Sequence, residues 1–149
     1  LHKTTSGAGS IVHPQTVSDM TVSFSYYYSS MSGNTGVLGS AYARYQSNND
    51  AVVCYFSDNS MQIDQRLNGV WTTIAPKNYS APTLPDRWYD VVIHSEGSNI
   101  QVWRAERGSP MEMVLITTSC QVLNSAYLRL ASFVDAPASD FRFDDVCVD

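Results

Sequence analysis

The chain has 149 residues and a formal net charge of −5, and 44% of its residues are hydrophobic, 11% aromatic and only 15% charged. This length is enough for one domain with a buried core, and the apolar content is too high for a disordered chain. The few Lys and Arg residues form no basic stripe, which argues against duplex nucleic acid as a partner, and no apolar run is long enough to cross a membrane.

Short runs of alternating polar and apolar residues, separated by turn residues, predict β-strands along most of the chain. No segment has a pattern that favours a helix. Asn68-Gly69 is the strongest hairpin-turn signal, whereas three prolines within residues 76–86 predict a loop. We expect ten or eleven short strands in an all-β, antiparallel two-sheet sandwich, a jelly roll. The strand runs are residues 20–28, 37–46, 51–57, 61–67, 70–75, 111–117, 126–133 and 141–148, with a hairpin over residues 86–107.

Side chains alternate between faces along a strand, so the same patterns assign faces within the hairpin. Its inward set consists of Tyr89, Val91, Ile93, Ile100 and Val102. Trp103 therefore points away from the core. Three interpretations stay open for this outward ring: cover by a loop such as residues 76–86, stacking on a sugar, or a protein interface. Trp88, where that loop returns to the sheet, is expected to anchor the edge of the core.

Alternation also predicts a polar face on three further strands. Aliphatic residues such as Met61, Ile63, Leu128 and Leu130 point inward. The side chains left outward are Tyr42, Arg44, Gln46, Gln62, Asp64, Arg66, Tyr127 and Arg129. Aromatic rings pack on the C–H-rich faces of sugars, planar amides and charges bond paired hydroxyls, and the arginines suit a uronate or a sulfate. An ordinary solvated sheet face with cross-strand ion pairs has the same pattern.

The three cysteines allow more than one bonding state, and one tripeptide matches a modification site. Cys54, Cys120 and Cys147 fit one disulfide with one remaining thiol, or three thiols without a bond, and their spacing does not favour a zinc site. Asn78-Tyr79-Ser80 is an acceptor pattern for N-glycosylation in the predicted loop.

Three short motifs occur in a particular order: W-Y-x-V-x-I at residues 88–93, S-x-I-x-V at residues 98–102 and F-D-D-V at residues 143–146. With this order and spacing, residues 18–149 resemble the concanavalin A-like lectin/glucanase jelly rolls, especially the laminin-G-like and family-66-like carbohydrate-binding modules of bacterial glycan-active proteins. The resemblance implies a concave and a convex sheet, and a further strand within residues 1–15. It also implies one structural Ca²⁺ where the first and last strands meet, with Asp144 at the matching position and Asp19 and Asp140 as companions.

Catalysis is not expected. Glucanases on this fold use two acids close together on one strand, as in E-x-D-x-x-E, and the sequence has no such run. It also has no G-x-S-x-G nucleophile elbow, and its three histidines are scattered.

The sequence therefore predicts one domain over residues 1–149, acting as a non-catalytic module of a larger secreted or cell-surface protein. Its expected partners are a polysaccharide on the concave sheet, bound by the eight outward residues above and Trp103, and other domains of the same polypeptide. The alternative is a structural or adhesive unit of an extracellular assembly that associates with itself. That alternative depends on Tyr26-Tyr27-Tyr28, which places aromatic rings on both faces of one strand.

Overall fold

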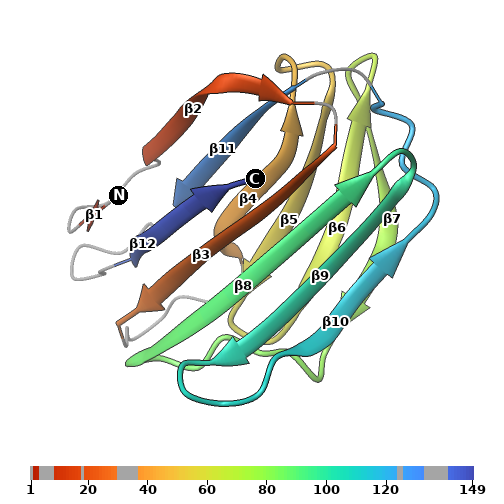
Figure 1. Ribbon diagram of the computed structural model, residues 1–149. Coiled ribbons are helices and arrows are strands. Elements are labelled where there is room, and N and C mark those ends of the chain that lie inside the picture. Colours follow the sequence, from red (N-terminus) through yellow and green to blue (C-terminus); the bar gives the residue numbers. More distant parts are fainter. Residues whose placement is uncertain (1, 4–8, 18, 30–36, 124–125, 133–140) are drawn as a thin grey trace.

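The structure is a computed structural model that describes residues 2–3, 9–17, 19–29, 37–123, 126–132 and 141–149. These residues form twelve strands and no helix (Figure 1), so they contain no helix of the length and apolarity needed to cross a membrane. The strands are β1 (His2–Lys3), β2 (Gly9–Val17), β3 (Met20–Tyr28), β4 (Val37–Tyr45), β5 (Ala51–Ser57), β6 (Met61–Leu67), β7 (Val70–Asn78), β8 (Arg87–Glu96), β9 (Asn99–Glu106), β10 (Glu112–Thr117), β11 (Ala126–Ser132) and β12 (Phe141–Val148).

Two six-stranded sheets pack face to face. The front sheet in Figure 1 has the order β1-β12-β3-β8-β9-β10, and the back sheet has the order β2-β11-β4-β5-β6-β7. All neighbouring strands pair antiparallel. The predicted all-β two-sheet sandwich is confirmed, and the further strand expected near the N-terminus corresponds to β2, with the short β1 in addition.

The core lies between the sheets and follows the predicted alternation. In the β8–β9 hairpin, all five residues of the predicted inward set are at most 5% exposed. Aromatic rings fill the middle: the Tyr26 ring stacks on Phe56 with centroids 4.8 Å apart, and on Tyr89 at 5.3 Å. The Tyr26 hydroxyl is 2.9 Å from the Thr83 hydroxyl. Burial raises the pKa of Tyr26 well above its usual range, so this phenol stays neutral.

The tyrosine run is accommodated within the fold. Tyr26 and Tyr28 are buried in the core, and Tyr27 lies on the outer face of the front sheet. There its ring packs against Trp88, with centroids 5.4 Å apart. The expectation that Trp88 anchors the core edge is wrong, because Trp88 has the outward parity opposite to that of Tyr89 and lies half-buried between Tyr27 and Arg107.

The predicted turn at Asn68-Gly69 is confirmed: both residues have positive φ, 51° and 84°, as in the two-residue turns that match the right-handed twist of hairpin strands. The predicted loop starts later than expected, because β7 continues through Pro76. Proline is tolerated there since β7 is an edge strand and needs no amide donor on its open side.

Asn78 is engaged inside the protein. Its side-chain nitrogen donates to the Val114 carbonyl at 2.7 Å, and its Oδ1 accepts from the Ser80 amide at 2.9 Å. The N-glycosylation tripeptide Asn78-Tyr79-Ser80 therefore lies in a turn that the Asn78 side chain caps. All three cysteines are free thiols, with Cys54 and Cys120 buried and Cys147 exposed.

Candidate functional site

The outer face of the back sheet, called here the open face, carries two long cross-strand rows. Both rows cross β11, β4, β5, β6 and β7 in that order, so residues from five strands meet side by side. The first row consists of Arg129, Tyr42, Val53, Asp64 and Thr73. The second row consists of Tyr127, Tyr45, Ala51, Arg66 and Trp71.

A β-bulge decides which residues of β4 reach the open face. Tyr42 pairs with Val53 and Arg44 pairs with Val52, so Ala43 is an extra residue on this strand. Both Ala43 and Arg44 therefore point inward, and Tyr45 turns outward. The prediction that Arg44 lies on the open face is wrong for this reason.

Gln46 follows the last residue of β4 and does not line the open-face pocket described below, so its place in the site stays a prediction. The other open-face predictions hold for orientation: Gln62, Asp64 and Arg66 alternate with buried Met61 and Ile63. Tyr127 and Arg129 likewise alternate with buried Leu128 and Leu130.

Arg44 is a fully buried connection between the sheets. Its Nη1 donates to the Gly97 carbonyl at 2.7 Å and to the Val122 carbonyl at 2.8 Å, and its Nη2 is 3.4 Å from Asp19 Oδ1. It therefore ties β4 to the β8–β9 turn and to the segment that precedes β11. Such bonds hold the fold together and leave nothing for a ligand.

A shallow pocket of about 50 Å³ opens on the open face. Ala51 forms its floor because a small side chain there sits between larger ones on both neighbouring strands. Tyr42 and Tyr45 stand on one side and Trp71 on the other, and the remaining lining residues are Ser47, Asn48, Arg66 and Arg129.

Both open-face arginines lie on aromatic rings. The Arg129 guanidinium carbon is 5.1 Å from the centroid of Tyr42 and 4.9 Å from that of Tyr45. The Arg66 guanidinium carbon is 5.5 Å from the centroid of Trp71, whose side chain is 44% exposed. These contacts spread the guanidinium planes over the rings and fix them before a ligand arrives.

The rim of the pocket is built from two hairpin turns that bond to each other. The Tyr45 hydroxyl donates to Asn48 Oδ1 at 2.9 Å, and the Gly69 amide donates to the Asn49 carbonyl at 3.0 Å. Arg66 spans the two turns: its Nε donates to the Gly69 carbonyl at 3.0 Å and its Nη1 to the Asn48 carbonyl. The rim is thus held in one arrangement by the protein itself.

Polar groups continue beside the pocket. Gln62 Nε2 donates to Asp64 Oδ2 at 2.9 Å, and Tyr55 lies in the next row, opposite Gln62. Burial, with smaller contributions from Tyr42 and Asp64, raises the pKa of Tyr55 to about 12, so its phenol stays a neutral donor at physiological pH.

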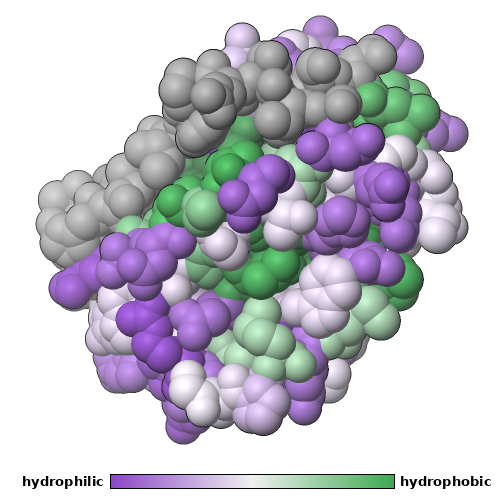
Figure 2. Space-filling view, in the orientation of Figure 1, coloured by the Kyte–Doolittle hydropathy of each residue, from purple (hydrophilic) through white to green (hydrophobic). Residues whose placement is uncertain are grey.

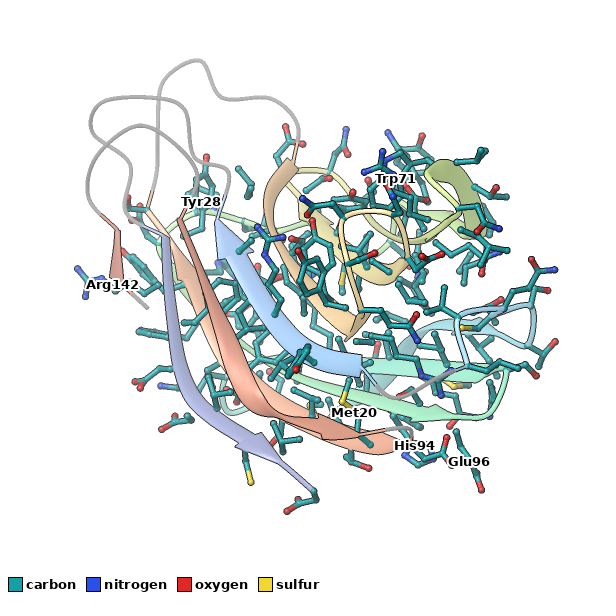
Figure 3. All side chains as sticks on the ribbon, turned by 90° about the horizontal axis from the view of Figure 1, so that it is seen from above. Met20, Tyr28, Trp71, His94, Glu96 and Arg142 are labelled. Atoms are coloured by element: carbon teal, nitrogen blue, oxygen red, sulfur yellow. The ribbon has the colours of Figure 1, made fainter. Side chains whose placement is uncertain are left out.

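Trp103 belongs to the other side of the molecule. It lies on the outer face of the front sheet in a shallow apolar pocket with Thr21, Val92, His94 and Met111. Figure 2 shows this face, where apolar side chains gather near the middle among hydrophilic ones. Figure 3 places the labelled Trp71 on one side of the sandwich and His94 and Glu96 on the other. Trp103 therefore cannot share one site with Tyr42, and Met111, not the loop of residues 76–86, lies beside its ring.

The sequence reasoning missed both Tyr45 and Trp71, and it also missed Ser47, Asn48 and Ala51. The position of Trp71 could have been predicted from the sequence. A two-residue turn at Asn68-Gly69 places Trp71 opposite Arg66 and therefore on the same face. Tyr45 had no such signal, since nothing around Ala43 marks a bulge.

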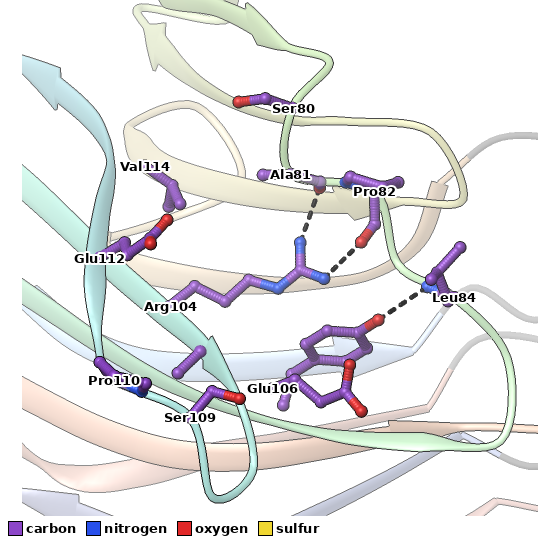
Figure 4. A pocket seen from close by; sticks show the side chains of 12 residues that line it. Ser80, Ala81, Pro82, Leu84, Arg104, Glu106, Ser109, Pro110, Glu112 and Val114 are labelled. Atoms are coloured by element: carbon purple, nitrogen blue, oxygen red, sulfur yellow. Dashed lines mark hydrogen bonds between the residues drawn. The ribbon is translucent and has the colours of Figure 1, made fainter.

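A larger pocket of about 320 Å³ lies between the segment after β7 and the β9–β10 region (Figure 4). Its central cation, Arg104, donates to the carbonyls of Ala81, at 2.6 Å, and Pro82, and stacks on Tyr89 at 3.9 Å. Glu106, also in its lining, pairs with Arg87 at 2.5 Å. Arg104 therefore holds the 79–86 segment against β9, whereas Glu112, also in the lining, forms no ion pair among the described residues.

The expected calcium ligands do not meet. Asp144 pairs with Ser25, six positions along β3 from Asp19, which corresponds to about 20 Å. Asp19 already bonds the Gly97 amide at 2.8 Å and faces Arg44, and Asp140 lies outside the described residues. Among the residues described, no three His, Cys, Asp or Glu side chains gather closely enough to hold a metal ion.

Comparison with known structures places the fold among the concanavalin A-like jelly rolls. The carbohydrate-binding module CBM66 from Bacillus subtilis superposes with a TM-score of 0.75 at 14% identity, covering 99% of this chain and 85% of that one. The exoplasmic/lumenal domain of VIP36, in a form bound to Ca²⁺ and Man3GlcNAc, has a TM-score of 0.74 at 9% identity, covering 97% and 74%. The GH43 protein BlXynB from Bacillus licheniformis has a TM-score of 0.61 at 10% identity, covering 89% of this chain and 29% of that one. No protein-family model and no curated protein matches the sequence.

Proposed function

We propose that this protein binds carbohydrate on the open face of its back sheet. The observation that carries the proposal is the pocket formed by Tyr42, Tyr45 and Trp71 around Ala51, with two guanidiniums and the Asn48 amide at its edge. Rings of this kind pack on the apolar faces of pyranoses, while amide and guanidinium groups bond hydroxyls. The likeness to a carbohydrate-binding module and to a glycan-bound lectin domain supports the same class of ligand.

The site is suited to binding and not to chemistry. None of the residues that line the open-face pocket is a carboxylic acid, whereas glycoside hydrolysis uses a pair of them. The proposal uses no metal ion, since the Asp19 carboxylate is engaged by Arg44 and Gly97 and lies far from Asp144. We therefore propose a non-catalytic role.

We further propose that residues 1–149 act as one module of a larger secreted or cell-surface protein. In such a protein the module holds a neighbouring domain near a polysaccharide and raises its effective concentration there. The assembly alternative has less support, because the aromatic residues of the tyrosine run pack within the fold.

A glycan array followed by titration calorimetry tests the proposal with a matched pair of tryptophans. Trp71→Ala should weaken binding of the selected glycan by about five- to tenfold, since stacking on an aromatic ring contributes about 1–1.5 kcal/mol. Trp103→Ala removes a ring of the same kind from the opposite face and should leave the affinity unchanged. Absence of any bound glycan, or an equal loss in both variants, would refute the proposed site.

A further inference from the structure

We infer that the open face selects acidic glycans, with Arg66 and Arg129 binding the anionic group of a uronic acid or a sulfated sugar. The inference rests on the proposed function and specifies its ligand class. It starts from an imbalance of charge: two arginines line the open-face pocket and no carboxylate does.

The same arginine–aromatic arrangement on the front sheet is neutralised by the protein. Arg107 lies over Trp88 at 4.7 Å, and its guanidinium is 3.3 Å from Asp90 Oδ1 and 3.1 Å from Asp145 Oδ2. On the open face, the described residues include no carboxylate within ion-pair distance of Arg66 or Arg129. On the front sheet, Asp90 and Asp145 balance the charge of Arg107. On the open face, no ion pair between described residues balances the charges of Arg66 and Arg129.

The acidic side chains nearest the pocket are already bonded elsewhere. Asp64 lies on the same face, where its Oδ2 accepts from Gln62 and its Oδ1 is buried without a partner among the described residues, and Asp50 in the rim turn accepts from the Asn68 amide at 2.9 Å. Neither carboxylate lines the pocket or forms an ion pair with Arg66 or Arg129. The guanidinium of Arg129 lies over the two tyrosine rings and lines the pocket, while its Nε is buried beneath. Arg66 donates to two backbone carbonyls, which carry no full charge, and neither arginine is in an ion pair within the described part of the chain, so an oxyanion of a ligand is the charged partner that both lack.

The two cations approach the pocket from opposite sides. Arg129 on β11 and Arg66 on β6 are separated by three strand spacings, which is about 15 Å between backbones. Both long side chains turn toward the hollow above Ala51 and line it together. A sugar lying across the aromatic edges would present an equatorial carboxylate or sulfate to one guanidinium and its hydroxyls to the other side of the rim.

The whole protein does not attract polyanions, because its net charge is −5. Binding of an acidic polymer would therefore depend on the local pair of arginines, and its weakening by salt should be modest compared with that of a basic protein surface.

The test compares acidic polymers with neutral counterparts by titration calorimetry on the intact chain. Polygalacturonate is paired with its fully methyl-esterified form, and dextran sulfate with dextran. We expect at least one acidic member to bind about tenfold more tightly than its neutral counterpart; the polygalacturonate pair identifies a carboxylate and the dextran pair a sulfate. Equal affinity within both pairs would overturn the inference while leaving carbohydrate binding intact, and absence of binding to every polymer and to the glycan array would overturn both.

Three variants connect the preference to the pocket. Arg129→Gln should lose the preference for the acidic polymer, and Arg129→Lys should recover part of it, because lysine keeps the charge without the two-pronged geometry. Arg107→Gln removes the neutralised arginine of the front sheet and should change nothing. Unchanged preference in a folded Arg129→Gln protein, with its denaturation midpoint as the check on folding, would contradict the inference.

Discussion

The two outer faces of the sandwich use the same pairing of arginine with aromatic rings in different ways. On the front sheet, Arg107 lies on Trp88 and is bonded by Asp90 and Asp145. On the back sheet, Arg129 lies on Tyr42 and Tyr45 around a hollow that contains no acid. Composition alone does not distinguish these surfaces. What distinguishes them is whether the fold itself provides the partner of each cation.

The two outer faces also differ in shape, because the open face has the small residue Ala51 between larger side chains. In the open-face row, Ala51 lies between Tyr45 and Arg66, and this change of side-chain size creates the hollow. The front-sheet row has Val92 beside Trp103, which leaves a shallower and almost wholly apolar depression. Polar hydroxyls would find few partners there. The open face is therefore the better candidate for a sugar.

Among the arginines, the largest effect on stability is expected at Arg44, which lies in the core and not on an outer face. Arg44→Ala should lower the free energy of unfolding by about 3 kcal/mol, because the carbonyls of Gly97 and Val122 lose charged donors worth about 1.5–3 kcal/mol each. Arg129→Ala, on the same sheet but outside the core, should cost only about 0.5–1 kcal/mol. Urea denaturation of both variants measures the difference, and equal midpoints would show that Arg44 is not the connection described.

The front-sheet stack should be of intermediate importance. Trp88→Ala loses a half-buried ring in contact with Tyr27 and Arg107, so we expect a destabilisation of about 1–2 kcal/mol. Phe24→Ala, which empties a core position, should cost about 3–5 kcal/mol. Thermal or chemical denaturation gives both values, and a Trp88 variant as unstable as the Phe24 variant would place Trp88 in the core after all.

Alkaline pH should weaken the fold through its buried phenols. The pKa of Tyr55 is raised from 10.0 to about 12 by burial, so between these values the unfolded chain releases a proton that the folded chain keeps. The contribution to stability is complete below pH 10 and is lost as the pH rises toward 12. Tyr55→Phe should reduce this slope in denaturation series, and an identical slope in both proteins would refute the assignment.

The smallest effect concerns Cys147, an exposed thiol on the outer face of the front sheet. A maleimide should modify this cysteine alone in the folded protein, with Cys54 and Cys120 reacting only after denaturation, as mass spectrometry would show. The added bulk should leave glycan affinity unchanged. A loss of affinity after labelling would move the site to the front sheet.

Alternation along regular strands was enough to predict the sandwich and three of the eight residues that line the open-face pocket, Tyr42, Arg66 and Arg129. It placed Gln62, Asp64, Arg66, Tyr127 and Arg129 correctly because β6 and β11 keep their parity over these residues. It failed at Arg44, since a bulge is set by pairing with two neighbouring strands and not by local sequence. It also could not place Trp103 relative to Tyr42, because parity assigns a face of a strand and not the sheet to which that strand belongs.

Chemical-shift mapping by NMR with the tightest glycan from the array tests the central claim most directly. The account predicts that backbone shifts concentrate on Tyr42, Tyr45, Ala51, Arg66, Trp71 and Arg129, with the Trp71 indole signal moving most. Shifts concentrated instead around Val92, Trp103 and Met111 would contradict it.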